Sequence, residues 1–161
     1  MTWLSQRSSS QPASDGMVTM SGGEELRLES LVGAWRLRSA VATDANGRTW
    51  NPFGEEPEGI LLYTTDRWVS ATIAASGPES GRCFYAGTVQ IAGDRLEHHV
   101  AVGQPPFGPG TVQVRQGRLV DDELELAAHA TDPVPVTTRL RWQRPSTAES
   151  EDVSTDSPGG S

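Results

Sequence analysis

The residue best suited to chemistry is His98, which lies in the middle of the chain among apolar residues at a spacing of two. Its apolar companions at that spacing are Leu96, Val100 and Val102, so the four side chains share one face of an expected strand. An imidazole among apolar neighbours could act as a general acid or base near neutral pH. The alternative is a buried histidine that holds the structure together through hydrogen bonds. The sequence leaves both interpretations open.

Two further reactive side chains, Tyr85 and Cys83, lie at the start of the strand expected before His98. The Tyr85 hydroxyl could polarise a substrate carbonyl together with His98, so these two are the candidate catalytic residues. The Cys83 thiol could act as a nucleophile, but a small side chain inside a strand is the favoured interpretation. The G-x-S-x-G elbow, the Walker loop, the Rossmann glycines and the H-E-x-x-H motif are absent.

The composition excludes several kinds of chemistry. All 13 basic residues are arginines, and without lysine no Schiff base can form. The histidines His98, His99 and His129 fall on different faces of the expected strands, and Cys83 is the single cysteine. This pattern argues against a zinc site, so we expect neither a metal nor a cofactor.

Polar and aromatic side chains could instead form the wall of a ligand cavity. Gln113 and Arg115 alternate with Val112 and Val114, and the pattern leaves open which pair faces inward. If the polar pair faces inward, Arg115 is a buried cation that needs a carboxylate partner or an anionic group of a ligand. The aromatic candidates could line the same cavity or simply fill the core. They are Trp35, Phe53, Tyr63, Trp68 and Trp142.

These residues need strands to position them, and the chain supplies eight. Runs with a two-residue apolar period are expected over residues 31–38, 59–65, 68–75, 84–91, 95–102, 111–118, 123–130 and 136–143. Short connections join nearly all of them, which indicates an antiparallel meander. We therefore predict an all-β fold, an eight-stranded antiparallel up-and-down β-barrel with one short N-terminal helix over residues 24–30. A flat sandwich is the alternative.

One connection, over residues 50–57, is unusual because Trp50 and Phe53 stand close together in it. It either folds back over apolar surface as a lid or plugs one end of the core without a functional role. The sequence favours neither interpretation.

The ends of the chain are too polar to belong to the core. We expect residues 24–144 to form the barrel domain and residues 1–23 and 145–161 to be disordered tails, the second of them acidic. The net charge of −8 argues against nucleic acid or an anionic membrane surface as a partner. Neither a signal peptide nor an apolar stretch of membrane-spanning length is apparent, so a cytoplasmic protein is expected.

A series of short motifs occurs in order between Leu31 and Arg144. They are LVGAWRL at 31–37, NPFG at 51–54, GILLYT at 59–64, YAG at 85–87, HHV at 98–100, QVR at 113–115 and LRW at 140–142. In this order and spacing the chain resembles the bacterial and fungal lipocalin-like domain proteins, one branch of the calycin barrels. The resemblance implies an eight- or nine-stranded barrel with a cavity for a small, largely apolar molecule. It also slightly favours inward-facing Gln113 and Arg115.

The sequence departs from the family at Trp68, where relatives usually carry a small or flexible residue, and this implies a narrower cavity. Some relatives in natural-product pathways look like cofactor-free cyclases or isomerases. One hypothesis is therefore a cofactor-independent cyclase or isomerase of a secondary-metabolite intermediate, working mainly by confinement of its substrate. The alternative is a non-catalytic carrier or a sequestering, resistance-type protein that binds the same kind of molecule. A third is a module that binds a partner through its acidic tails.

Overall fold

The computed structural model describes residues 25–75, 82–131 and 133–145, and the two expected tails lie outside this part of the chain apart from residue 145. Within it, the elements in chain order are α1 (Leu28–Leu31), β1 (Gly33–Asp44), β2 (Thr49–Trp50), β3 (Glu58–Tyr63), β4 (Trp68–Ala74), β5 (Arg82–Ala92), β6 (Arg95–Gly103), β7 (Val112–Val120), β8 (Glu123–Ala130) and β9 (Val136–Gln143). The eight expected strands are present, and β2 is a short addition. None of the helices in the described residues is long and apolar enough to cross a membrane.

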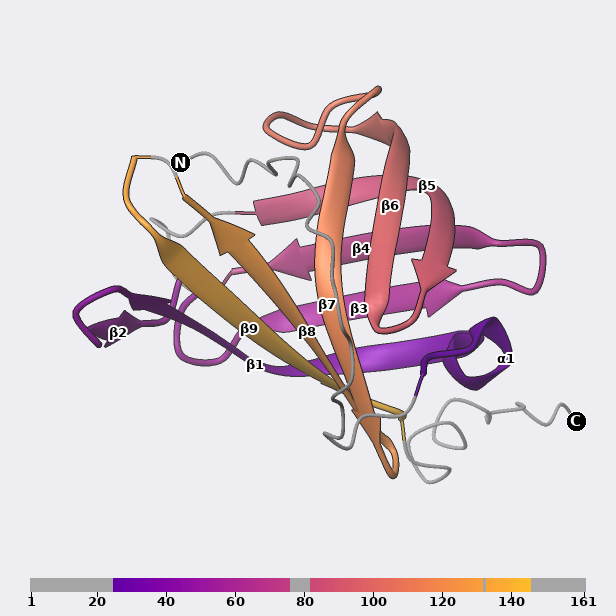
Figure 1. Cartoon of the computed structure of the whole chain (residues 1–161), viewed down its shortest axis with the longest axis horizontal. Helices are drawn as coiled ribbons and strands as arrows, with labels where there is room; N and C mark the ends of the chain where they lie inside the picture. Colours follow the sequence, from indigo (N-terminus) through magenta and orange to yellow (C-terminus); the bar gives the residue numbers. More distant parts are fainter. Residues whose placement is uncertain (1–24, 76–81, 132, 146–161) are drawn as a thin grey trace, which may run out of the picture.

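The strands form one antiparallel sheet that closes on itself (Figure 1). From β3 to β9 each strand pairs with the next one in sequence, and β9 pairs back with β1 over Arg36 to Asp44. The first residues of β1 pair with β3 instead, so β1 joins the two edges of the sheet. The prediction of an eight-stranded up-and-down barrel is confirmed, with β2 attached to the end of β1 outside the ring.

The helix is shorter than the sequence indicates. Arg27 has extended backbone angles, φ −127° and ψ 145°, so α1 begins only at Leu28 and the expected start at residue 24 is wrong. The preceding stretch is tied to the barrel instead, because the Leu26 amide donates to the Gly93 carbonyl at 3.0 Å. Burial of the Leu26 side chain favours this extended path over another helical turn.

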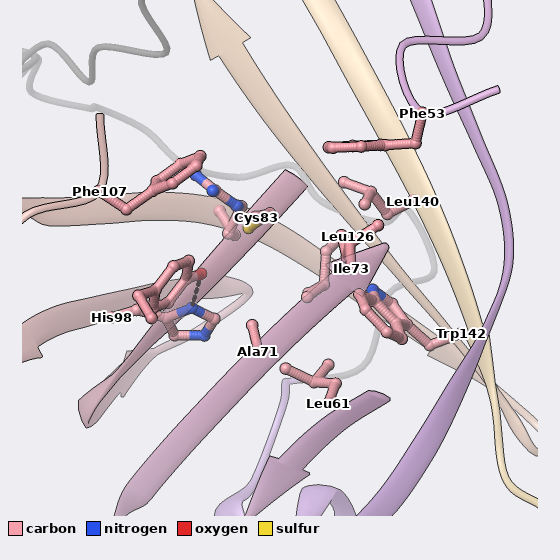
Figure 2. A pocket seen from close by; sticks show the side chains of 12 residues that line it. Phe53, Leu61, Ala71, Ile73, Cys83, His98, Phe107, Leu126, Leu140 and Trp142 are labelled. Carbon is pink, nitrogen blue, oxygen red and sulfur yellow. Dashed lines mark hydrogen bonds between the residues drawn. The ribbon is translucent and has the colours of Figure 1, made fainter. Parts of the chain in front are cut away.

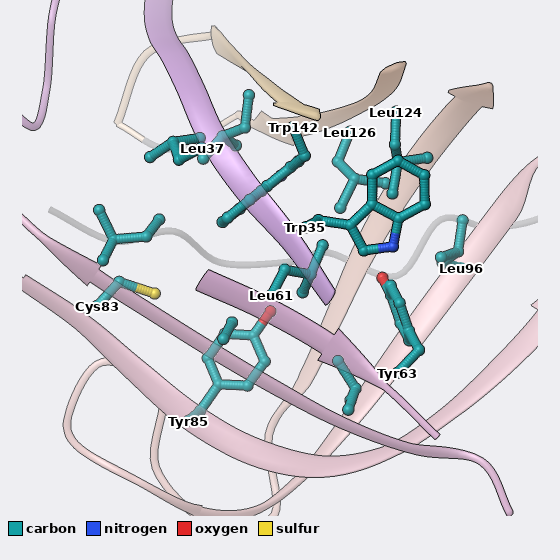
Figure 3. Packing of buried hydrophobic residues seen from close by; sticks show 14 of the residues in the cluster. Trp35, Leu37, Leu61, Tyr63, Cys83, Tyr85, Leu96, Leu124, Leu126 and Trp142 are labelled. Atoms are coloured by element: carbon teal, nitrogen blue, oxygen red, sulfur yellow. The ribbon is translucent and has the colours of Figure 1, made fainter. Parts of the chain in front are cut away.

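Alternating side chains fill the barrel interior. Trp35 and Leu37 are buried, and the arginines between and after them, Arg36 and Arg38, are exposed, as the pattern predicts. The Trp35 indole N–H donates to the Leu31 carbonyl at 2.9 Å, which fixes α1 against the first strand. Figure 3 shows the Trp35 ring beside Leu124, within the packed core.

A bulge between β5 and β6 corrects the expected face of one residue. Gly87 pairs with Val100, but Ala86 pairs with Val102, so Ala101 is an extra residue on β6. The alternation reverses after it, and Val102 is 58% exposed although the sequence placed it inside. A Cβ atom on Gly87 would lie 1.9 Å from the His99 carbonyl oxygen, so only glycine fits this bulge.

The two ends of the barrel are closed in different ways. At the end that carries α1, Leu31 is fully buried and Leu26 packs against the backbone of Gly117. At the opposite end, the loops over residues 51–57 and 104–111 each bury one phenylalanine, Phe53 and Phe107. At this end the barrel interior is covered by loop side chains and not by a helix.

Trp50 and Phe53 therefore differ in burial. Trp50 lies in β2 and is 41% exposed, whereas Phe53 folds back over the interior and is 7% exposed. The lid and the plug expected from the sequence involve both aromatics of this loop, but only Phe53 covers apolar surface. This covering position makes Phe53 part of the candidate site.

Candidate functional site

A small cavity lies inside the barrel beneath the two loops (Figure 2). Its wall is formed by Phe53, Leu61, Ala71, Ile73, Cys83, Tyr85, His98, Phe107, Arg115, Leu126, Leu140 and Trp142. Its volume is about 30 Å³, and since a water needs roughly 10–15 Å³ by this measure, it has room for about two waters. A larger depression on the outer surface runs over β7, β8 and β9, but of the histidines and the candidate catalytic and ligand-binding residues it contains only His129. The interior cavity is therefore the candidate site.

His98 is buried at the cavity between two tyrosines. The Tyr63 hydroxyl lies 2.9 Å from its Nε2 atom, and the Tyr85 hydroxyl lies 2.7 Å from its Nδ1 atom. A neutral imidazole has one donor and one acceptor nitrogen, so one tyrosine accepts its N–H and the other donates its O–H. Both ring nitrogens are thus occupied.

The surroundings of His98 also keep it neutral. Burial lowers its pKa from 6.5 to about 3, and the charge of Arg115 and the nearby His99 add to the effect. A histidine with this pKa and two engaged nitrogens is a poor general base near neutral pH. The geometry favours the structural interpretation, in which His98 orients the two tyrosines.

The other reactive groups of the cavity also remain protonated. Burial raises the pKa of Tyr85 to about 12, although the charge of Arg115 and a hydrogen bond from its side chain oppose the rise. Burial likewise raises the pKa of the Cys83 thiol to about 11, which disfavours the nucleophilic thiolate. The Tyr85 hydroxyl therefore keeps its proton, and Cys83 is a small neutral part of the cavity wall.

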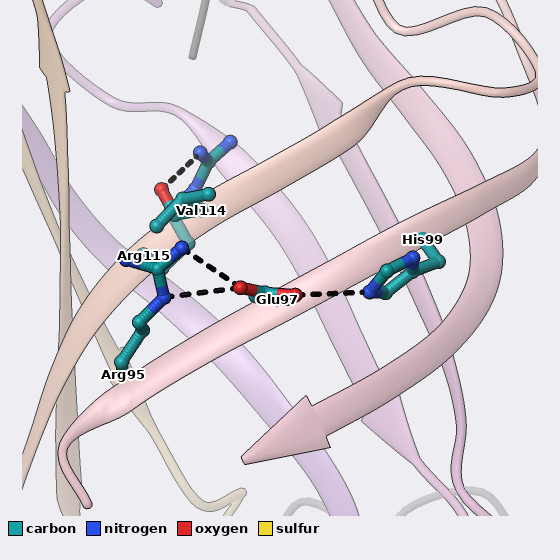
Figure 4. Close-up of polar contacts among 5 residues, drawn as sticks. All are labelled: Arg95, Glu97, His99, Val114 and Arg115. Atoms are coloured by element: carbon teal, nitrogen blue, oxygen red, sulfur yellow. Dashed lines mark hydrogen bonds and ion pairs between the residues drawn. The ribbon is translucent and has the colours of Figure 1, made fainter. Parts of the chain in front are cut away.

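Gln113 and Arg115 both face inward, which answers the question that their alternation left open. They are 4% and 9% exposed, respectively. Arg115 lines the cavity and donates from Nη1 to the carbonyl of Val114 at 2.9 Å (Figure 4). Gln113 lies away from the cavity wall and donates from Nε2 to the Thr111 hydroxyl at 3.2 Å.

Across the described residues, no carboxylate forms an ion pair with Arg115. The acidic residue paired with its strand neighbour Val114 is Glu97 on β6, and it points away from the cavity. Glu97 is engaged there by Arg95 at 2.8 Å and His99 at 3.1 Å (Figure 4). The hydrogen bond from Arg95 is the main reason that the pKa of Glu97 is lowered. The cation at the cavity wall is thus left without a protein counter-charge in this part of the chain.

The aromatic candidates divide into three groups. Phe53 and Trp142 line the cavity, whereas Trp35 and Tyr63 are buried outside its wall. Trp68 is 47% exposed on the outside of the barrel, so its expected place in the cavity wall is wrong. The hairpin before β4 sets this register: the Thr64 amide donates to the Trp68 carbonyl, and the next residue, Val69, faces inward.

Sequence reasoning missed part of the wall. Leu61, Ala71 and Ile73 follow the two-residue apolar period of β3 and β4, which predicts that they face inward. They are nevertheless not among the ligand-binding residues expected from the sequence. Phe107 lies in a segment rich in glycine and proline, where no period indicates which side chain is buried. Its ring packs at 5.4 Å between centroids against Tyr85, which only the folded chain reveals.

Among the residues that the structure describes, two buried side-chain polar atoms lack a hydrogen-bond partner, Gln113 Oε1 and Trp142 Nε1. Trp142 is 2% exposed, and its ring forms part of the cavity wall. Within the part of the chain that the structure describes, no group of three or more His, Cys, Asp or Glu side chains could hold a metal ion. The polar wall of the cavity therefore consists mainly of hydrogen-bond donors.

Comparison with known proteins gives one family match. Residues 32–84 match the family model described as a lipocalin-like domain. No curated protein matches the chain.

Two solved structures resemble the fold. The redesigned beta barrel b11L5F_LGL is 15% identical, with a TM-score of 0.44, covering 74% of this chain and 95% of its own. The structure of EF1p2_mFAP2b bound to DFHBI is 14% identical, with a TM-score of 0.45, covering 73% of this chain and 95% of its own. At these TM-scores neither likeness bears on function.

Proposed function

We propose that this closed barrel binds one small, mostly apolar organic molecule in its interior and serves as a carrier or sequestering protein, and the match of residues 32–84 to a lipocalin-like domain supports this. The observation that carries the proposal is the cavity itself. Apolar side chains from several strands surround it, a few buried polar side chains stand among them, and two loops cover it. This combination is typical of small-molecule sites.

The cavity is too small for such a molecule as it stands. Ligand sites usually measure roughly 300 Å³ or more, ten times the volume present. Phe53 and Phe107 supply the difference, because both rings belong to loops and can move without breaking the ladder of the barrel. Binding therefore exchanges two buried phenylalanine rings for the apolar body of the ligand.

The chemistry of the wall favours binding over turnover. His98, Tyr85 and Cys83 all hold their neutral forms near pH 7. A carrier needs affinity for the ground state of its ligand and no proton transfer. The site provides shape, apolar contact and hydrogen-bond donors, which suit that role.

A cofactor-independent cyclase or isomerase is the second candidate, supported by one specific feature. Arg115 and Tyr85 both reach the cavity, and a cation beside a hydroxyl donor can stabilise negative charge that develops on a carbonyl oxygen. In this role Tyr85 accepts the Nδ1–H of His98 and donates its own proton to the carbonyl, Arg115 supplies the charge, and His98 positions Tyr85. Confinement of a flexible substrate between the loops would supply orientation.

Binding of the neutral apolar probe N-phenyl-1-naphthylamine tests the proposal. We expect its fluorescence to rise with the wild-type protein and to fall sharply with Ala71→Leu, which fills the cavity. Ala74→Leu, three residues on and exposed on the same strand, is the matched control and should bind like wild type. Equal binding by all three proteins, or none by wild type, would contradict binding in the barrel interior.

Native mass spectrometry separates the carrier from the enzyme. The purified protein is incubated with a small-molecule extract of its source organism, and the bound compound is compared with its free form by retention time. An unchanged compound held stoichiometrically supports the carrier. A compound of equal mass and altered retention, formed in more than stoichiometric amount, supports the isomerase or cyclase.

A further inference from the structure

We propose that the molecule held in this barrel carries an anionic group, in its simplest form a carboxylate, and that Arg115 binds it. The inference rests on the proposed function and adds the chemical class of the ligand. It predicts an amphiphile whose charged head lies at Arg115 while its apolar body takes the place of the two phenylalanine rings.

The first support is the state of Arg115. Its side chain is 9% exposed and lines the cavity, so its cation has little access to water. A buried guanidinium is costly unless a negative charge or a full set of acceptors compensates it. Of its five N–H donors, the structure accounts for a bond to the Val114 carbonyl and a contact with the Tyr85 hydroxyl. Several donors therefore remain for a ligand.

The second support is that the part of the chain that the structure describes offers no competing anion. Glu97, on the neighbouring strand, is taken by Arg95 and His99 on the outer side of β6. In the described ranges, the cavity wall contains no aspartate or glutamate. Its titratable members besides Arg115 are His98, Tyr85 and Cys83, all neutral near pH 7. The site is complementary to a negative charge that arrives from outside.

The third support is independent of Arg115. Trp142 lines the same cavity, is 2% exposed, and its indole N–H has no acceptor in the described part of the chain. A buried donor without a partner costs free energy in the empty protein, and an acceptor on a ligand would remove that cost. Arg115 and Trp142 are both donors, so the cavity wall presents unmatched donors and no carboxylate of its own among the described residues.

The rest of the wall defines the other half of the ligand. Ile73, Leu126 and Leu140 are apolar and face the same space as the donors. Polar heads without an apolar body would leave these contacts unused, and an apolar body alone would leave the donors unpaired. An organic anion with a hydrocarbon portion satisfies both.

Two competitors with the same hydrocarbon chain test the inference. Decanoate and decan-1-ol are each titrated against bound N-phenyl-1-naphthylamine at pH 7.5. We expect decanoate to displace the probe at a concentration at least about tenfold lower than decan-1-ol, because a charge-assisted contact is worth at least that factor. Equal displacement by the two, or better displacement by the alcohol, overturns the proposal with the wild-type protein alone.

Variants then assign the effect to Arg115. Arg115→Gln should abolish the preference for decanoate and leave decan-1-ol unchanged, while Arg115→Lys should retain part of the preference. Arg118→Gln is the matched control, since Arg118 is exposed on the outer side of the same strand. A preference that survives Arg115→Gln in a folded protein overturns the assignment.

These outcomes are separate from the fate of the proposed function. If the neutral probe binds but decanoate has no advantage, interior binding stands and the anionic ligand class is wrong. If the probe and both competitors fail to bind wild type by fluorescence and by calorimetry, the binding function itself is wrong. Circular dichroism of each variant identifies any that fail to fold.

Discussion

At the scale of single residues, His98 is defined by its two tyrosine partners and by burial. The pair of hydrogen bonds, at 2.9 Å to Tyr63 and 2.7 Å to Tyr85, fixes the ring and leaves it no free nitrogen. Its pKa of about 3 in the folded protein lies below the 6.5 of an unfolded histidine. The unfolded chain therefore takes up a proton below about pH 6.5 that the folded protein does not.

This difference predicts a loss of stability in mild acid. The contribution of His98 is complete above pH 6.5 and decreases as the pH falls toward 3, because protonation favours the unfolded chain. Between pH 6.5 and pH 5 the free energy of unfolding should fall by about 2 kcal/mol. In His98→Gln, whose amide can still donate and accept, this slope should be absent in urea titrations at each pH.

The matched control for the acid slope is His129→Gln. His129 is exposed and contacts the Thr137 hydroxyl at 3.0 Å. Its replacement should leave the slope as in wild type. A slope of equal size in His98→Gln would show that another group takes up the proton.

Tyr63 and Tyr85 should be equivalent for stability but different for binding. Removing either hydroxyl leaves one nitrogen of His98 unpaired and should lower the free energy of unfolding by about 1–3 kcal/mol. Only Tyr85 lines the cavity, so Tyr85→Phe should weaken decanoate binding while Tyr63→Phe leaves it intact. Thermal unfolding and probe displacement measure the two effects, and equal binding losses would contradict this division.

At the scale of elements, the bulge at Gly87 determines which residues of β6 face the cavity. The alternation that places Leu96, His98 and Val100 inside ends where Ala101 is inserted. Without the bulge, Val102 would also point inward, and the start of the following loop would be displaced. The bulge thus sets the position at which β6 continues into the loop that carries Phe107.

Gly87→Ala should be strongly destabilising. The added Cβ would lie 1.9 Å from the His99 carbonyl oxygen, and backbone atoms must move to relieve the clash. We expect a loss of roughly 3 kcal/mol in the free energy of unfolding. Gly108→Ala, where nothing lies within 4 Å of the new Cβ, should change it by less than about 0.5 kcal/mol. Chemical denaturation of both variants measures the difference.

Elements also explain what the sequence could predict. Strands with a clean two-residue period, such as those of Trp35 and His98, were located with the correct inward face. The inward face expected for Val102 is wrong because a bulge depends on how two strands pair, and the alternation within one strand does not reveal it. The cavity position expected for Trp68 is wrong because it rests on the aromatic type of the side chain, whereas the register of the hairpin decides which face of the strand the side chain occupies.

The site was less predictable than the fold for a similar reason. Arg115 and Val114 are both plausible inward residues until β7 is paired with β6, so the alternation left the choice open. Phe107 comes from a loop, where position depends on long-range packing and not on local period. The unpartnered Trp142 N–H is visible only when every neighbouring acceptor is placed.

At the scale of the whole molecule, Arg144 holds the closure of the barrel. Its guanidinium stacks 4.0 Å from the Trp35 ring and donates to the carbonyls of Val32 at 3.1 Å and Ser30 at 2.8 Å. The residue just after the last strand thus secures both α1 and the start of the first strand. The contact joins the two ends of the described domain.

Loss of this contact should destabilise the entire barrel. Arg144→Ala removes a cation–π contact and two hydrogen bonds to carbonyls, and we expect a loss of about 1–3 kcal/mol. Arg141→Ala removes only an exposed ion pair of 3.8 Å with Glu123 and should cost less than about 0.5 kcal/mol. The midpoint of thermal unfolding measures both, and equal shifts would contradict the role of Arg144.

The unlike ends of the barrel have a kinetic consequence. Since α1 packs one end shut, the ligand that we propose would enter and leave past Phe53 and Phe107 at the other end. A smaller side chain at either position leaves less ring volume for the proposed ligand to displace, so association should accelerate and the affinity should rise. Loss of the Arg115 charge would instead act mainly on the lifetime of the complex, so the two halves of the site control different rate constants.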